Sequence, residues 1–216
     1  MNGQLWWYLS RASGVIAWLM LTATVLWGIA SSADLFQRRR RVAGLVDLHR
    51  WLGGLTVGFV ALHLAALVAD SYVHFGPTDQ FVPFASDWKP LPEALGVMAF
   101  WGLLAVQGTS LAIRRLRRRT WHTIHLAGYA VFVLGSFHGI TAGTDATQPM
   151  YVATTAVSMA AVGWASIRRI RRLEERSRTQ PGRPALNATG HPGGPVGGSG
   201  PRPEPRTRVP TGSHGR

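Results

Sequence analysis

Residues Asp47 to Asp70 decide the fold, and they read Asp-Leu-His-Arg-Trp-Leu-Gly-Gly-Leu-Thr-Val-Gly-Phe-Val-Ala-Leu-His-Leu-Ala-Ala-Leu-Val-Ala-Asp. Between Arg50 and Asp70 no residue carries a formal charge. An uncharged apolar run of about 20 residues is long enough to cross the hydrocarbon core of a bilayer as a helix. The stretch therefore predicts a membrane-spanning helix that carries two histidines, His49 and His63.

The spacing of these two histidines places one imidazole near each side of the membrane. At about 1.5 Å per residue, 14 residues separate the rings by about 21 Å along the helix axis and return them to within about 40° of one face. Ionisable side chains inside membrane spans are rare and tend to mark functional sites. His49 and His63 are therefore candidate ligands.

Composition favours a membrane protein of one domain, with 46% hydrophobic residues, nine tryptophans and 15% charged residues in 216. The net charge of +13 does not predict nucleic-acid binding, because most arginines flank apolar runs, where they act as topology signals. The chain has no cysteine. Disulfides, thiolate zinc sites, iron–sulfur clusters and covalently attached c-type haem are thereby excluded.

Hydropathy and charge predict an all-α bundle with about five membrane-spanning helices in the lipid bilayer of a plasma or inner membrane. The predicted spans cover residues 12–33, 49–70, 94–113, 120–144 and 150–167. Three arginine clusters alternate with two loops that are nearly free of cations, so we expect the N-terminus outside and the C-terminus in the cytoplasm. We expect no cleaved signal peptide. Four prolines in the acidic loop 70–93 are expected to break any helix there.

Two regions are expected, a membrane domain over residues 1–172 and a disordered basic tail over residues 173–216. Glycine and proline make up 17 of the last 40 residues, and large apolar side chains are almost absent from them. Such a segment cannot bury enough apolar surface to offset the loss of chain entropy on folding.

The fourth predicted span repeats the pattern of the second, with His125 near its arginine-flanked start and His138 13 residues later. Both spans run from inside to outside, so His49 and His125 should lie near the cytoplasm, and His63 and His138 near the outside. Facing helices of a bundle hold cofactors between such side chains. The pattern predicts two haems b, each with two histidine ligands to its iron.

Three alternatives remain open at this point. Each histidine could simply hydrogen-bond a neighbouring helix. Zinc is a weaker possibility, because structural zinc needs four ligands together. His122 is a rival of His125 as the inner ligand. In addition, 13 residues leave an ideal helix about 140° short of four full turns, so the pair His125 and His138 requires a distorted helix.

Other residues fit a bound macrocycle or plain helix packing equally well. Small residues let helices or a flat ring approach the backbone, and the candidates are Gly53, Gly54, Gly58, Gly128, Gly135 and Gly139. Arg50 near the inner surface and Arg11 near the outer surface are candidate partners of haem propionates. Both arginines also fit a role as interfacial anchors.

The two histidine motifs resemble a known family. Asp47-Leu-His-Arg-Trp-Leu-Gly with His63, and Trp121-His-Thr-Ile-His-Leu-Ala-Gly-Tyr with His138-Gly139, resemble the ferric-reductase-like transmembrane domain. That family includes ferric reductases, the membrane part of NADPH oxidases and the haem subunit of a bacterial methionine sulfoxide reductase. The resemblance covers roughly residues 10 to 170. It implies that the four histidines of the second and fourth spans are haem ligands.

The resemblance also implies that electrons pass from a cytoplasmic donor outward. The tail has no strand–helix pattern and no glycine fingerprint of a flavin or nicotinamide domain. The expected chain is therefore an oxidoreductase component that takes electrons from a separate flavoprotein, carrying FAD or FMN, or from quinol, and passes them to an outer-face acceptor. The alternatives are a quinol-linked cytochrome b subunit of a dehydrogenase complex and a haem-free membrane scaffold or transporter.

Overall fold

The computed structural model describes residues 2–32, 43–70, 76–143 and 147–179, and every regular element in these ranges is a helix. The elements are α1 (Asn2–Ser32), α2 (Ala43–Ala69), α3 (Pro77–Phe81), α4 (Pro90–Leu111), η1 (Ile113–Arg115), α5 (Arg118–Leu126), α6 (Gly128–Ala142) and α7 (Pro149–Thr179). Within the described residues, five segments are long and apolar enough to cross a membrane, α5 and α6 counting together as one. The predicted all-α architecture with five spans is confirmed.

The distribution of polar and apolar side chains is that of helices packed in lipid. The largest fully buried side chains among the described residues are small and polar, namely Thr56, Ser13 and Ser136. Their hydroxyls donate to carbonyls of the preceding turn, as Thr56 does to Leu52 at 2.8 Å. Large apolar side chains instead lie on the outside, with Trp51 71% exposed. Small residues between helices and apolar residues facing outward are typical of membrane bundles.

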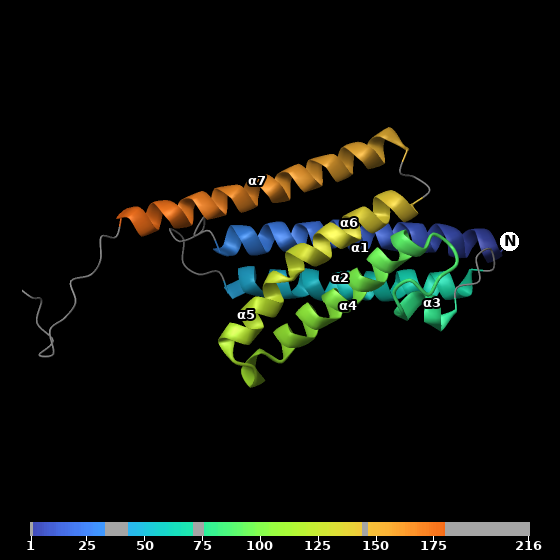
Figure 1. The fold of residues 1–216 in the computed structure, drawn as a ribbon, viewed down its shortest axis with the longest axis horizontal. Coiled ribbons are helices and arrows are strands. Elements are labelled where there is room, and N and C mark those ends of the chain that lie inside the picture. The colour runs from blue at the N-terminus through green and yellow to red at the C-terminus, as the bar shows by residue number, and fades with distance from the viewer. Residues whose placement is uncertain (1, 33–42, 71–75, 144–146, 180–216) are drawn as a thin grey trace, which may run out of the picture. The chain divides into compact units, whose positions relative to one another are not determined.

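Two helix pairs organise the part of the chain up to residue 174. α2 packs along α1, and α6 packs along α4, while α1 also contacts α6 (Figure 1). α3 lies against the start of α4. A small apolar cluster of Ile29, Phe132 and Val162 joins α1, α6 and α7. The two pairs thus place the second and fourth predicted spans in one bundle.

The prediction that prolines break any helix in the loop 70–93 is wrong in two places. Pro90 and Pro92 lie in the first turn of α4, and Pro77 opens α3. Proline is tolerated in a first turn because the N–H that it lacks has no intrahelical acceptor there. The Gly76 N–H donates to Asp79 Oδ2 at 2.8 Å and so caps α3.

The fourth predicted span is interrupted between its two histidines. α5 ends at Leu126 and α6 begins at Gly128, and the Ala127 N–H donates to the Ile124 carbonyl at 3.0 Å. This bond reaches back three residues rather than four, which tightens the turn to about three residues and adds rotation per residue. The interruption therefore turns the chain in the direction that the 13-residue spacing of His125 and His138 requires.

The C-terminal boundary differs in detail from the expectation. α7 continues to Thr179, past the predicted start of the tail at residue 173. The remainder of the predicted disordered tail, residues 180–216, lies outside the described residues.

Candidate functional site

The inner pair of histidines comes together between α2 and α5. The rings of His49 and His125 lie 5.8 Å apart between centres, at an interplanar angle of 67°. Trp121 stacks on the other side of His125, with ring centres 4.9 Å apart and an interplanar angle of 23°. His122 is exposed, and its ring lies 6.4 Å from that of Trp121. The structure thus places His125, rather than its rival His122, against His49.

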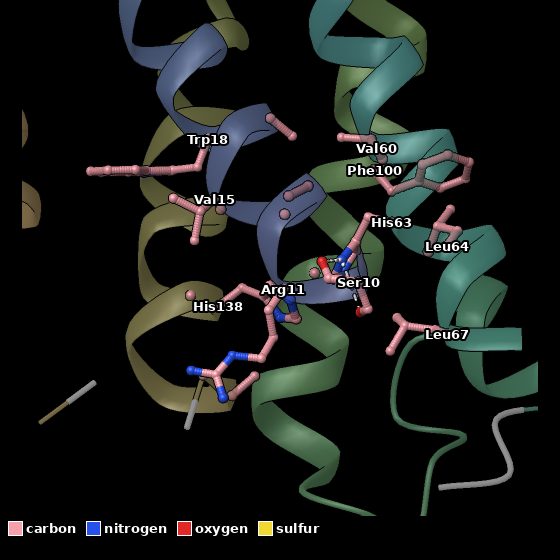
Figure 2. A pocket seen from close by; sticks show the side chains of 18 of the residues that line it. Ser10, Arg11, Val15, Trp18, Val60, His63, Leu64, Leu67, Phe100 and His138 are labelled. Carbon is pink, nitrogen blue, oxygen red and sulfur yellow. Dashed lines mark hydrogen bonds between the residues drawn. The ribbon is translucent and has the colours of Figure 1, made fainter. Parts of the chain in front are cut away.

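The outer pair lines one cavity of about 330 Å³, a size typical of small-molecule sites. His63 enters it from α2 and His138 from α6 (Figure 2). The two rings are close enough to interact electrostatically. The apolar part of the wall includes Val15, Ala17, Trp18, Leu21, Val60, Leu64, Leu67, Val97, Phe100, Leu103 and Val131. The cavity is therefore a mostly apolar space with an imidazole from each of two helices.

Hydrogen bonds fix which nitrogen of the outer histidines carries the proton. His63 Nδ1 lies 2.7 Å from the Ser10 carbonyl oxygen, and His138 Nδ1 lies 2.8 Å from the Pro92 carbonyl oxygen. A carbonyl oxygen can only accept, so in each ring Nδ1 is the donor. The neutral rings therefore keep a lone pair on Nε2. That is the arrangement in which a histidine ligates a metal and is oriented by a neighbouring group.

His125 reaches the same tautomer through a side chain. Its Nδ1 lies 3.3 Å from Ser110 Oγ, and that hydroxyl donates to the Val106 carbonyl at 2.7 Å. A serine hydroxyl has a single hydrogen, so towards His125 it acts as an acceptor and Nδ1 is the donor. Nε2 of His125 is again the nitrogen that is free to bind a metal.

Two buried side-chain nitrogens at the inner level, His49 Nδ1 and Trp121 Nε1, have no hydrogen-bond partner among the described residues. The Thr24 carbonyl influences His49 but does not meet hydrogen-bonding geometry. Buried polar atoms in native proteins are almost always paired. Unpaired nitrogens are typical of a place where another group binds.

The two candidate arginines differ in position. Arg11 lines the outer cavity, where its guanidinium carbon lies 4.2 Å from the centre of the Trp7 ring, and Figure 2 shows it beside His138. Gln80 from α3 is buried at the same cavity and donates to the Leu64 carbonyl at 3.4 Å. Arg50 is exposed on α2, next to His49. Only Arg11 contributes to the outer cavity.

None of the six glycines singled out from the sequence faces a histidine. A Cβ atom at Gly54, Gly58 or Gly128 would meet nothing within 4 Å, and one at Gly53, Gly135 or Gly139 would meet Gln107, Leu21 or Tyr151, respectively. The glycines that face imidazoles are Gly14, Gly28 and Gly96. The available signal was their position on the other helix of each pair, where Gly14 and Gly28 repeat the 14-residue spacing of His49 and His63.

Among the described residues, no group of three or more histidine, cysteine or acidic side chains comes together. A zinc site with four protein ligands therefore has no support in that part of the chain. The histidines form pairs, each of which could offer two Nε2 atoms to one metal.

Comparison with known proteins identifies one family. The model of the family described as ferric reductase like transmembrane component matches residues 12–136, which is more than half of the chain. The match contains His49, His63 and His125 and ends two residues before His138. No curated protein and no solved structure matches the chain.

Proposed function

This chain belongs to the ferric reductase like transmembrane component family, and from that premise we propose that it is a di-haem b cytochrome that conducts electrons across the membrane. Membership implies a multi-pass membrane protein of an electron-transfer family whose members typically bind haem. The observation that carries the proposal is the meeting of four histidines in two pairs, three of them with Nδ1 engaged and Nε2 free.

The residues present fit an iron porphyrin at each level. Metal–imidazole bonds are about 2 Å long, so two nitrogens on opposite sides of one iron lie about 4 Å apart, with their ring centres somewhat further apart. The 5.8 Å between the ring centres of His49 and His125 is of this size. In the proposal, His49 and His125 hold the inner haem, and His63 and His138 hold the outer haem.

When bound, haem supplies a one-electron couple whose potential depends on its axial ligands and surroundings. The protein's own residues orient the ligands and exclude water. The apolar walls contributed by α1, α4 and α6 lower the local dielectric constant around the outer pair. Arg11 offers a positive charge at this cavity for a propionate, and the exposed Arg50 offers one near the inner pair.

The proposed direction of transfer is from the cytoplasm outward. Arginines cluster at the end of the bundle that carries the inner pair, and such clusters mark the cytoplasmic side. The exposed members between α4 and α5 are Arg114, Arg115, Arg117, Arg118 and Arg119. A flavoprotein with FAD or FMN, or quinol, is the proposed donor on this side, and the proposed acceptor lies on the outer side.

Reconstituted vesicles test the function. Protein expressed with haem supply is inserted into lipid vesicles that contain ferricytochrome c, and a reductant that does not cross the bilayer is added outside. We expect the protein haems and then the trapped cytochrome to be reduced, and protein-free vesicles to show neither.

Two outcomes would contradict the proposal. Purified protein without haem absorbance would favour the haem-free scaffold or transporter. Haems that quinol reduces and that a flavoreductase does not reduce would instead favour the quinol-linked subunit of a dehydrogenase complex.

A further inference from the structure

Three of the four paired histidines pack against a glycine of a neighbouring helix. A Cβ atom at Gly96 would lie 2.7 Å from both Cε1 and Nδ1 of His138, and one at Gly14 would lie 3.0 Å from Nδ1 of His63. At Gly28 the distance to Cε1 of His49 would be 3.3 Å. Real Cβ atoms essentially never approach other atoms to less than 3.0 Å, so the first position has no room for any side chain.

Each glycine follows, by four residues, a carbonyl that faces the same histidine. The Ser10 carbonyl accepts from His63, and Gly14 lies beside that ring. The Pro92 carbonyl accepts from His138, and Gly96 lies beside that ring.

The inner level follows the same rule. The Thr24 carbonyl influences His49, whose ring lies beside Gly28. For His125, the Val106 carbonyl and Ser110 occupy the corresponding positions, with the Ser110 hydroxyl between the carbonyl and the ring.

Helix geometry explains the offset of four. In an α-helix the carbonyl of residue i points towards the N–H of residue i+4, so the side chain at i+4 flanks the carbonyl oxygen. A glycine at i+4 leaves that oxygen open from the side. An imidazole can then donate Nδ1–H to it without breaking the helix bond. We call each carbonyl with its small residue four positions later a histidine seat.

The four seats form a repeat. Gly14 and Gly28 are 14 residues apart on α1, and Gly96 and Ser110 are 14 residues apart on α4. The partner helices carry their histidines 14 and 13 residues apart, and the interruption at Ala127 lies within the shorter spacing. The pair of α1 with α2 and the pair of α4 with α5 and α6 thus use one device at both levels.

We propose that Gly14, Gly28, Gly96 and Ser110 are positioning residues that set the tautomer and the orientation of the four histidines, and thereby hold Nε2 towards the iron. The inference rests on the proposed function, because it concerns binding of the same haems. α1 and α4 then have a defined role although they carry no ligand. Outer-shell partners of this kind typically contribute about 10- to 100-fold to metal affinity.

Alanine substitutions test the seats, with haem per chain and the electron paramagnetic resonance spectrum as readouts. We expect Gly96→Ala to lose the outer haem, because its new methyl group displaces His138. Gly14→Ala should weaken the outer haem less, and Gly28→Ala should perturb the inner haem least, in the order of the distances above. The milder variants keep the test decisive if Gly96→Ala does not fold.

Two variants of α4 are matched controls. A Cβ atom at Gly108 would meet nothing within 4 Å, so Gly108→Ala should keep both haems. At Gly102 it would lie 2.7 Å from Val131 Cγ2, so Gly102→Ala produces an equally tight clash that involves no histidine.

Three results separate the possible conclusions. If Gly102→Ala loses haem as Gly96→Ala does, general helix packing explains the loss and the inference is overturned. Unchanged haem content and spectra in all three seat variants would also overturn it. Absence of haem from the wild-type protein would overturn the proposed function itself.

Ser110 offers a second measurement at the inner level. Ser110→Ala removes the acceptor of the His125 Nδ1–H, which makes the imidazole a weaker electron donor. We expect the midpoint potential of the inner haem to rise. Ser110→Gly recreates the seat found at the other three positions and should leave the potential closer to that of the wild type. Equal potentials in both variants would contradict a positioning role for Ser110.

Discussion

The His63→Ala protein is expected to retain one haem per chain and to lose electron transfer across the membrane. His63 and His138 share the outer cavity, and removal of one imidazole leaves any iron there with a single protein ligand. His49 and His125 lie at the other level and keep their contact. The levels are about 21 Å apart along α2, and electron transfer falls exponentially with distance.

Haem per chain, measured from the absorbance of the extracted pyridine complex, checks this prediction. His49→Ala is the matched variant at the inner level and should also retain one haem, with the spectrum of the outer site. The transfer assay in vesicles should fail for both variants. Full haem occupancy in His63→Ala would show that this residue is not a ligand.

The second large effect separates two histidines that are three residues apart in the sequence. His125→Ala is expected to lose the inner haem, whereas His122→Ala is expected to keep both haems and to conduct electrons. The reason is geometric, because the ring of His125 faces His49 while the side chain of His122 is exposed. The stack of Trp121 on His125 also holds the latter ring in place.

The two variants serve as controls for each other, because each removes one imidazole from α5. Haem content and the low-spin signal of the oxidised protein are the measurements. Loss of a haem in His122→Ala with full occupancy in His125→Ala would reverse the assignment of the inner ligand.

The positions of the histidines along their helices could be predicted from sequence because the membrane imposes simple rules. Apolar runs of fixed length became helices, and arginine clusters set the relative direction of successive helices. Direction and rise per residue were then enough to place His49 level with His125, and the rings of these two residues do meet.

Features that depend on the partner helix could not be predicted in this way. The interruption at Ala127 is formed by one backbone bond to Ile124, and nothing in the side chains there demands it. The seats were missed because a glycine's role depends on what faces it across the interface. Gly54 and Gly96 are equally small, but only Gly96 lies against an imidazole.

The prolines near the outer loop show the same limit. Sequence rules assign Pro92 to a break, but in the structure it lies in the first turn of α4. Its carbonyl accepts the Nδ1–H of His138, so a residue expected to end structure instead helps to orient a ligand.

The most direct test of the account is the number and the ligation of the haems in the wild-type protein. Purified protein should contain two haems per chain, and electron paramagnetic resonance of the oxidised form should show two low-spin irons, each with two imidazole ligands. Haem content of one or none, or a high-spin iron with a single imidazole, would contradict the claim that paired histidines hold a haem at each of two levels.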